Sequence, residues 1–430
     1  MSDINSLVGS LMELEDKLIS CMKCGFCQAV CPVFGVTMME ADVTRGKIAL
    51  LENLAHKMID DPEAVSDKLN RCLLCGSCQV SCPSGVNIMD IFMRARHIVA
   101  AYLGLSTVKK LIFRSLLANP GLFNTLTRLG LPFQGIVMRK QNNAQDTVCA
   151  PLLSMFIGDR HIPSPPAKPL HSAVGELDTA PGKSGLKIAF FPGCMGDKLY
   201  TGMAQACLKV FAHYGVGVFM PSGLTCCGMP ALASGDQQGA AKQVMANVDA
   251  LKKGDFSHIV TPCGSCTAAF REWWPHLAPG MPAEYQATAR ELAGKAIDIN
   301  AFLIDILKAE ALPQKGDQRK VTYHDPCHLK KSLGISDQPR SVIRLNPAYE
   351  LVEMPEADRC CGCGGSFSLF HYDLSKEISQ RKRNNVIGSG AKVVATGCPA
   401  CMMQMTDILA QNKDAVTVKH PVELYAEALP

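Results

Sequence analysis

The spacing of the cysteines constrains this chain more than any other feature. The sequence holds 21 cysteines in 430 residues, and most of them recur at short, regular intervals. Cys360 and Cys361 are adjacent, and adjacent cysteines pair poorly with each other because the disulfide would be strained. The N-terminus lacks the basic start and the cleavage site of a signal peptide, so we expect a cytoplasmic chain with reduced thiols. In that setting, cysteine clusters of this density indicate metal ligands.

Two motifs of one kind lie in the first hundred residues. The segments CMKCGFCQAVCP and CLLCGSCQVSCP share the spacing C-x2-C-x2-C-x3-C-P. This spacing resembles the bacterial ferredoxin run, in which three close cysteines bind one [4Fe–4S] cluster and the fourth binds the other. The resemblance implies two cubane clusters, the first held by Cys21, Cys24, Cys27 and Cys82, and the second by Cys72, Cys75, Cys78 and Cys31.

The 40 residues between these motifs are predicted to form helices. The run RGKIALLENLAHKMI has helical spacing, and DPEAVSDKLN offers Asp61 as a helix cap with Pro62 in the first turn. A helical insertion favours an α-helical ferredoxin domain, here residues 1–100, over the compact and mostly β kind. Two clusters bridged in this way would carry single electrons.

Residues 101–185 are predicted to connect domains. No acidic residue occurs from Ile91 to Gln145, whereas basic and apolar residues alternate at helical spacing. One interpretation is a set of surface helices that join two domains. The other is an amphipathic element that docks on an anionic membrane surface or on a partner. The proline-rich segment that follows, residues 159–185, is predicted to be an exposed linker.

The remainder of the chain contains an internal duplication. Three cysteine elements recur in phase, with offsets of 133 residues from Cys194 to Cys327, 134 from Cys226 to Cys360, and 135 from Cys263 to Cys398. A repeat kept over three separated elements indicates two copies of one domain, expected at 186–312 and 313–430. In each copy, short apolar strands run into cysteine loops and then into helices. This alternation predicts a parallel α/β layer with the cysteines at the carboxyl ends of its strands.

Each copy offers five candidate ligands, more than a tetrahedral metal ion or a cubane cluster needs. They are Cys194, Cys226, Cys227, Cys263 and Cys266, and then Cys327, Cys360, Cys361, Cys398 and Cys401. Adjacent cysteines can reach neighbouring irons of one larger cluster, and Gly228 or Gly362 lets the backbone come close. The pattern resembles the cysteine-rich "CCG" domain of heterodisulfide reductases, which can hold a non-cubane [4Fe–4S] cluster. The resemblance implies one or two such clusters; a zinc site, or one copy without metal, is the alternative.

The whole chain resembles the iron–sulfur subunits of glycolate oxidase and D-lactate dehydrogenase. Two ferredoxin motifs, a helical connection and two CCG domains occur in this order, and YHDPCHL also looks like that group. Cys363 departs from the pattern and is either an extra ligand or a buried spare thiol. The expected fold is therefore α+β and multidomain: an α-helical ferredoxin domain followed by two duplicated α/β CCG domains.

The resemblance implies that the chain is an oxidoreductase subunit rather than a complete enzyme. FAD would lie only on a partner subunit that oxidises a 2-hydroxy acid, since no dinucleotide fingerprint occurs in this sequence. Electrons would pass through this chain to a quinone or another carrier, with the protein in the cytoplasm or peripheral on the inner face of the membrane. Nothing in the sequence indicates nucleic-acid binding.

A second functional interpretation keeps a catalytic role for the non-cubane cluster. It would reduce a disulfide at iron, as in heterodisulfide reductase, with His324 and His328 as proton donors beside Cys327. The simpler role for both histidines is helix capping or hydrogen bonding to the cluster sulfurs. The order of the domains favours the electron relay.

Overall fold

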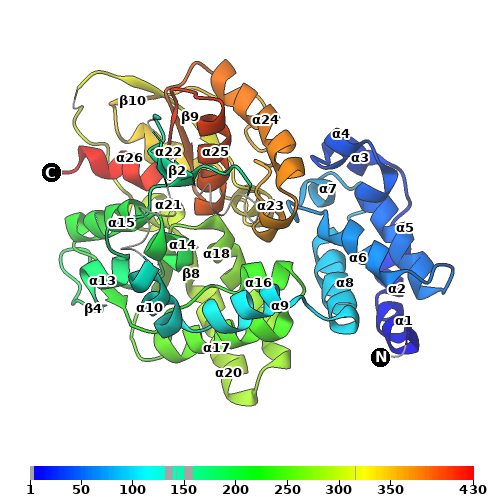
Figure 1. Cartoon of the computed structure of the whole chain (residues 1–430). Helices are drawn as coiled ribbons and strands as arrows, with labels where there is room; N and C mark the ends of the chain where they lie inside the picture. Colours follow the sequence, from blue (N-terminus) through cyan, green and yellow to red (C-terminus); the bar gives the residue numbers. More distant parts are fainter. Residues whose placement is uncertain (1–3, 131–138, 142, 150–157, 315) are drawn as a thin grey trace.

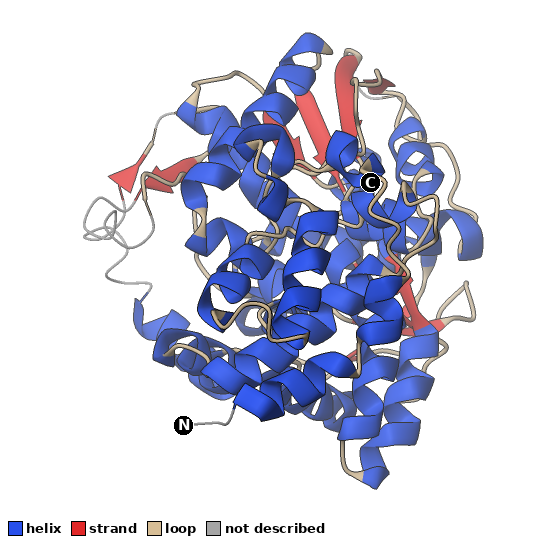
Figure 2. Ribbon diagram, turned by 90° about the vertical axis from the view of Figure 1, so that its right-hand side faces the viewer, coloured by secondary structure: helices blue, strands red, loops and turns tan. Residues whose placement is uncertain are grey.

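The computed structural model describes residues 4–130, 139–141, 143–149, 158–314 and 316–430 of the chain. A helical N-terminal module lies to one side of two α/β units, and the C-terminus lies on the far side of the molecule from this module (Figure 1). Helices flank the strands of these units (Figure 2). The α+β multidomain fold expected from the sequence is confirmed.

The N-terminal module contains helices only, over described residues 4–103. Asp61 caps a helix as predicted, because its carboxylate accepts a hydrogen bond of 2.8 Å from the backbone N–H of Ala64, and Pro62 opens the first turn. Leu51 and Ile91 are fully buried in the shared core. The helices are α1 (Ile4–Met12), α2 (Glu15–Ile19), α3 (Phe26–Val30), α4 (Phe34–Thr37), η1 (Glu40–Asp42), α5 (Thr44–Ala55), α6 (Pro62–Asn70), α7 (Ser77–Val80) and α8 (Ile88–Leu103).

The connecting region is more ordered than predicted. The proline-rich segment is not simply an exposed linker: Leu170 is fully buried, and β4 adds an antiparallel strand to the first sheet. Residues 131–138 of the basic stretch lie outside the described residues. The elements are α9 (Thr107–Lys110), η2 (Leu111–Leu116), α10 (Pro120–Gly130), β1 (Arg139–Lys140), β2 (Thr147–Cys149), β3 (Ile162–Pro163), α13 (Leu170–Val174) and β4 (Leu177–Asp178).

The basic stretch joins the module to the first α/β unit. Arg96 is buried and donates hydrogen bonds to the carbonyls of Leu69 and Cys72 in the module and of Ala233 in the first unit. Arg114 forms a two-pronged ion pair with the buried Asp236. These two arginines therefore connect the module and the basic stretch to the first unit and are not free surface charges.

One helix of the same stretch keeps an apolar face in solvent. Leu122, Leu126 and Leu129 of α10 are 41%, 51% and 59% exposed, and their spacing places them along one side of the helix. This exposed apolar face fits the second interpretation of the basic stretch, namely an amphipathic element that docks on a membrane surface or on a partner.

The two α/β units have the same strand order, as the duplication predicts. The first sheet runs β4-β6-β5-β7-β8 and the second runs β10-β9-β11-β12, so β5, β6, β7 and β8 correspond to β9, β10, β11 and β12. All pairs are parallel except β4 with β6. The order reverses between β5 and β7, and between β9 and β11. Parallel sheets collect ligands at such switch points, beyond the carboxyl ends of their strands.

The strands and helices of the units alternate along the chain. In the first unit they are β5 (Lys187–Phe190), α14 (Gly193–Lys198), α15 (Thr201–Tyr214), β6 (Gly217–Met220), α16 (Met229–Ala233), α17 (Gln237–Leu251), β7 (His258–Thr261), α18 (Gly264–Ala268), η5 (Ala269–Trp273), α19 (Trp274–Leu277), η6 (Ala278–Gly280), α20 (Ala283–Lys295), β8 (Ala296–Asp298), α21 (Ile299–Ala301) and η7 (Phe302–Ile306). In the second they are β9 (Arg319–His324), η8 (His328–Ser332), α22 (Asp337–Arg344), β10 (Tyr349–Leu351), α23 (Ser366–Phe370), α24 (Tyr372–Gly388), β11 (Val393–Thr396), α25 (Pro399–Gln411), β12 (Thr417–Lys419) and α26 (Pro421–Ala428).

Arg96 provides a test of how the module is attached. Arg96→Ala leaves several buried carbonyls without a donor, so we expect it to lower the stability of the loaded protein by about 3 kcal/mol. Arg94→Ala is the matched control, because the Arg94 side chain is 51% exposed and its ion pair with Asp90 is worth about 0.5 kcal/mol. Urea midpoints followed by circular dichroism under argon measure both. Equal midpoints for the two variants would contradict this account.

Candidate metal centres

The two ferredoxin-type loops have the same backbone conformation. Lys23 and Leu74 have φ of +55° and +51°, and Gly25 and Gly76, which open α3 and α7, have φ of +92° and +70°. The helices α3 and α7 pack against each other. The repeated motif thus builds the same turn twice, with the two loops side by side.

The second ferredoxin-type site brings together the four cysteines predicted for it. Cys31, which follows α3, lines a small cavity with the three cysteines of the other loop: Cys72, Cys75 and Cys78. Backbone N–H groups point at two of these sulfurs, from Phe34 to Cys31 at 3.5 Å and from Leu74 to Cys72 at 3.4 Å. Such donors stabilise the negative charge of cluster sulfurs.

The first ferredoxin-type site lies nearer the surface. Cys24 is exposed, whereas burial raises the pKa of Cys27, and the charge of nearby Cys21 raises it further. Arg45 lies beside the loop and donates a hydrogen bond of 3.2 Å to the carbonyl of Lys23. The fourth predicted ligand, Cys82, is half-buried and follows α7 as Cys31 follows α3.

The cysteine loops of the two α/β units meet face to face. The backbone N–H of Gly264 in the first unit donates to the carbonyl of Gly397 in the second at 3.0 Å. Ser265 Oγ lies 3.5 Å from the sulfur of Cys398. One cavity of about 130 Å³ is lined by all ten predicted cysteines of the two copies, Cys194, Cys226, Cys227, Cys263, Cys266, Cys327, Cys360, Cys361, Cys398 and Cys401.

Buried side chains hold the backbone of each adjacent cysteine pair. In the first unit, Asn247 donates to the carbonyl of Cys226 at 2.9 Å, and the indole N–H of Trp274 donates to that of Cys227 at 3.0 Å. In the second, Ser379 donates to the carbonyl of Cys361 at 2.8 Å. Sequence reasoning missed these residues, because none belongs to a motif and all come from helices distant in the sequence.

The second cysteine of each adjacent pair has a lowered pKa. Hydrogen bonds from Cys226 and Cys266 lower the pKa of Cys227 to about 5. Hydrogen bonds from neighbouring thiols, first among them Cys360, lower the pKa of Cys361 well below its ordinary value. A lowered pKa at the equivalent position of each copy favours the thiolate, the form that binds metals.

The glycine after each pair adopts a left-handed conformation, with φ of +96° at Gly228 and +93° at Gly362. Of these two glycines, only Gly362 lies too close to a neighbouring backbone carbonyl for a side chain to fit. A Cβ there would lie 2.7 Å from the carbonyl oxygen of Ser375, whereas the nearest atom at Gly228 would be 3.6 Å away.

The two candidate histidines have different surroundings. Burial, with the charge of Lys382, lowers the pKa of His324 to about 3. Burial also lowers the pKa of His328, whose Nδ1 lies 3.1 Å from Ser265 Oγ. Cys363 is 2% exposed and lines the same cavity as the predicted ligands, which places this thiol at the second site.

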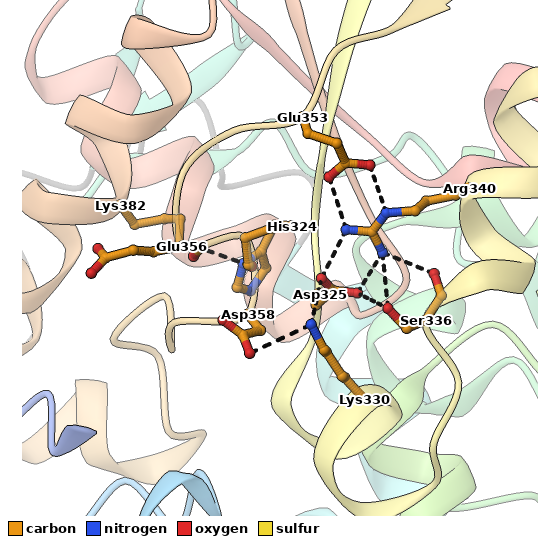
Figure 3. A network of polar contacts seen from close by, with 10 residues as sticks. His324, Asp325, Lys330, Ser336, Arg340, Glu353, Glu356, Asp358 and Lys382 are labelled. Atoms are coloured by element: carbon orange, nitrogen blue, oxygen red, sulfur yellow. Dashed lines mark hydrogen bonds and ion pairs between the residues drawn. The ribbon is translucent and has the colours of Figure 1, made fainter.

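An ion-pair network anchors the segment that carries His324 and Cys327 (Figure 3). Arg340 binds both carboxylate oxygens of Asp325, at 2.8 and 2.9 Å, and also binds Glu353. A two-pronged, buried pair of this kind fixes orientation more firmly than a single contact. The first unit has Pro192 where the second has Asp325, so only the second copy has this network.

The helical module and the second unit meet at a pair of sulfurs. The thiols of Cys75 and Cys360 lie close together, and their interaction is the main cause of the raised pKa of Cys75. Both belong to one small apolar cluster with Leu73. Beside them, Lys331 donates to Ser77 Oγ at 2.6 Å. The second ferredoxin-type site therefore adjoins the site of the second copy.

The residues at all these positions fit iron–sulfur clusters. The sulfurs converge in groups, backbone donors face several of them, and Lys47 lies buried beside the Cys31 and Cys72 sulfurs, where a cation offsets cluster charge. Clusters of this type are ligated by cysteine thiolates.

Comparison with known families agrees with this chemistry. Residues 17–86 match the 4Fe-4S dicluster domain, and residues 188–271 and 321–406 each match the cysteine-rich domain called CCG. These matches define an iron–sulfur protein with one dicluster domain and two cysteine-rich domains. The chain belongs to the family of iron–sulfur subunits that includes the glycolate oxidase iron-sulfur subunit and lactate utilization protein A.

Three relatives illustrate the extent of the similarity. The probable glycolate oxidase iron-sulfur subunit of Bacillus subtilis is 28% identical over 91% of this chain and 89% of its own. The glycolate oxidase iron-sulfur subunit of Escherichia coli is 25% identical over 97% and 96%. Lactate utilization protein A of Geobacillus kaustophilus is 32% identical over 56% of this chain and 98% of its own.

One solved structure resembles the whole chain in fold. A hypothetical protein from Helicobacter pylori aligns over 100% of this chain and 77% of its own, with a TM-score of 0.50 and 11% identity. Among the described residues, no helix combines the length and the apolar character that a membrane span requires.

The close approach at Gly362 can be tested directly. Gly362→Ala forces a Cβ onto the Ser375 carbonyl, so we expect the second copy to lose its metal, about four iron atoms per chain. Gly390→Ala is the matched control, because Gly390 has φ of +72° but open space around a Cβ. Iron analysis of anaerobically purified protein measures the difference. Full iron content in Gly362→Ala would contradict the importance of this approach.

Proposed function

We propose that the chain is the electron-relay subunit of an FAD-linked 2-hydroxy-acid dehydrogenase. The observation that supports this most strongly is the unbroken run of cysteine groups, from the ferredoxin-type loops through Cys75 and Cys360 to both CCG sites. Electron transfer between clusters requires short separations, and neighbouring cysteine groups in this run would provide them.

The ligand sets follow the sequence prediction. Cys21, Cys24, Cys27 and Cys82 would hold the first cubane cluster, and Cys31 would join Cys72, Cys75 and Cys78 at the second. The five cysteines of each CCG copy would hold a non-cubane [4Fe–4S] cluster. These clusters supply one-electron redox chemistry, and the chain's own residues set their spacing and the hydrogen bonds to their sulfurs.

The partner would be a flavoprotein. Relatives of this chain are named as glycolate oxidase iron-sulfur subunits, which supports a hydroxy acid as the substrate of the complex. On the partner, the hydroxy acid would lose two electrons and two protons to FAD and become a 2-oxo acid. The reduced flavin would then release the electrons singly to this chain.

The two ends of the run have different surroundings. At one end, the exposed Cys24 lies between Met22 and Phe26, which are 68% and 63% exposed, and this apolar surface suits a protein partner. At the other end, a cavity of about 290 Å³ adjoins Cys194 and is lined by Phe123 and Lys198. We assign the flavoprotein to the first end and the electron acceptor to the second.

A quinone is the acceptor that these surroundings favour. It would take two electrons from the clusters and two protons from water to become a quinol. The cavity beside Cys194 is partly covered by α10, whose exposed leucines lie in the stretch without acidic residues. An apolar helix face in a basic stretch suits the anionic membrane surface in which quinones reside. We therefore propose that the protein acts at the membrane periphery on the cytoplasmic side.

Co-purification tests the proposed function. We expect the tagged chain, isolated anaerobically from its native cells, to bring a flavoprotein with it, and either D-lactate or glycolate to bleach the cluster absorbance. A preparation without flavin, whose reduced clusters are reoxidised by a disulfide, would instead support a heterodisulfide-reductase-like function and overturn the relay.

A substitution of Cys31 tests whether the fourth cysteine of each ferredoxin-type loop binds the cluster of the other loop. Cys31→Ser should remove a ligand of the second cubane cluster, so we expect iron to fall from about 16 to about 12 atoms per chain. Bleaching of the CCG clusters by the substrate should be lost as well. Cys149→Ser is the control, because Cys149 lies on β2 outside every motif. Unchanged iron and bleaching in Cys31→Ser would show that this ligand set is wrong.

A further inference from the structure

His324 lies against the sulfurs of the second CCG copy. It ends β9, three residues before Cys327, and its side chain is fully buried. A ring nitrogen of His324 and the sulfurs of Cys361 and Cys401 all lie within 4.8 Å of one another. The three groups come from three separate segments: His324 ends β9, Cys361 lies in the loop before α23, and Cys401 lies in the first turn of α25.

The hydrogen bond of the imidazole fixes which nitrogen is available. Nδ1 lies 3.1 Å from the carbonyl oxygen of Ala357. A carbonyl oxygen only accepts, so Nδ1 carries the proton and Nε2 of the neutral ring has a free lone pair. Nε2 is buried and has no hydrogen-bond partner among the described residues. A ring held by a carbonyl at one nitrogen, with the other nitrogen bare, is the usual arrangement of a metal-bound histidine.

We propose that Nε2 of His324 is a ligand of the metal centre in the second CCG copy, beside Cys361 and Cys401. This inference rests on the proposed function only in requiring that the second copy holds metal. Two thiolates on one tetrahedral metal lie roughly 3.7 Å apart, given metal–sulfur bonds of about 2.3 Å. A spacing of at most 4.8 Å therefore needs only a small contraction for all three groups to bind a single metal atom.

The surroundings of His324 hold it in this orientation. Lys382 donates to the carbonyls of Glu356, at 2.5 Å, and Ala357, at 3.2 Å, which fixes the acceptor of the imidazole N–H. On the other side, Asp325 is locked by Arg340, and Figure 3 shows His324 between these two anchors. A histidine that only filled space would not require a fixed ring orientation.

The first copy lacks this ligand. The residue 133 positions earlier is Phe191, which is fully buried with its ring 5.0 Å from that of Phe270. The two copies would therefore hold different centres, one with thiolate ligands only and one with a nitrogen ligand as well. Ligand identity is one of the factors that set the reduction potential of an iron–sulfur centre, so a nitrogen ligand in one copy alone would give the two centres different potentials. The second copy would then differ from the first in potential as well as in ligands.

Pulsed EPR with isotope-labelled histidine tests the assignment. In the reduced, cluster-loaded full chain, we expect a strongly coupled nitrogen that changes from the ¹⁴N to the ¹⁵N pattern when histidine is labelled. His324→Phe should abolish this coupling, and the packing should tolerate it because the first copy has phenylalanine at the equivalent position. His328→Gln is the control and should keep the coupling, since the Nδ1 of His328 contacts Ser265 instead. If metal analysis finds zinc in the second copy, X-ray absorption at the zinc edge gives the same ligand count.

The results that would contradict the assignment of His324 differ from those that would contradict the proposed function. A loaded wild-type protein with no strongly coupled histidine nitrogen, or a coupling that survives in His324→Phe, would overturn the inference while leaving the relay intact. If Cys398→Ser leaves the metal content unchanged, the second copy holds no metal, and both the inference and the proposed ligand set fail.

Discussion

The arrangement of this molecule depends on the contact between the cysteine loops of the two duplicated units. Each unit collects its thiols at the switch point of a parallel sheet, and the hydrogen bond from Gly264 to Gly397 joins the two switch points directly. Most of these thiols are buried because the two sets of loops cover each other, and Cys194 and Cys327 are half-buried. The helical module then adds its own sulfurs at the contact between Cys75 and Cys360. The cysteine loops of each copy therefore form one wall of the cavity that the two copies share.

Duplication followed by divergence explains the differences between the two copies. Strand order, the adjacent cysteines and the acidic second thiol are common to both. The second copy alone has the Asp325–Arg340 pair, and it has a histidine in place of Phe191. A relay gains from such differences, because two equal centres in series give the electron no preferred position. The sheet architecture common to both copies would therefore set the distance between the two metal centres. The side chains that differ between the copies would set the difference in their reduction potentials.

The sequence predicts the fold class and the ligand loops well, because cysteine spacing and an in-phase repeat are strong local signals. It also predicts the cap at Asp61, where a single side chain decides the helix start. It does not predict that Arg96 is buried between two parts of the chain, or that Asn247 and Trp274 support the first cysteine pair. These contacts join segments far apart in the sequence, and no local pattern encodes them.

The central claim is that the module and both copies form one continuous relay, and magnetic coupling between clusters tests it most directly. We would record EPR spectra of the fully reduced chain alone, over a range of temperatures and at two microwave frequencies. Adjacent paramagnetic clusters broaden and split each other's signals, so the account predicts spectra that cannot be reproduced as a sum of isolated clusters. A spectrum that equals such a sum at both frequencies would place the clusters too far apart and contradict the relay.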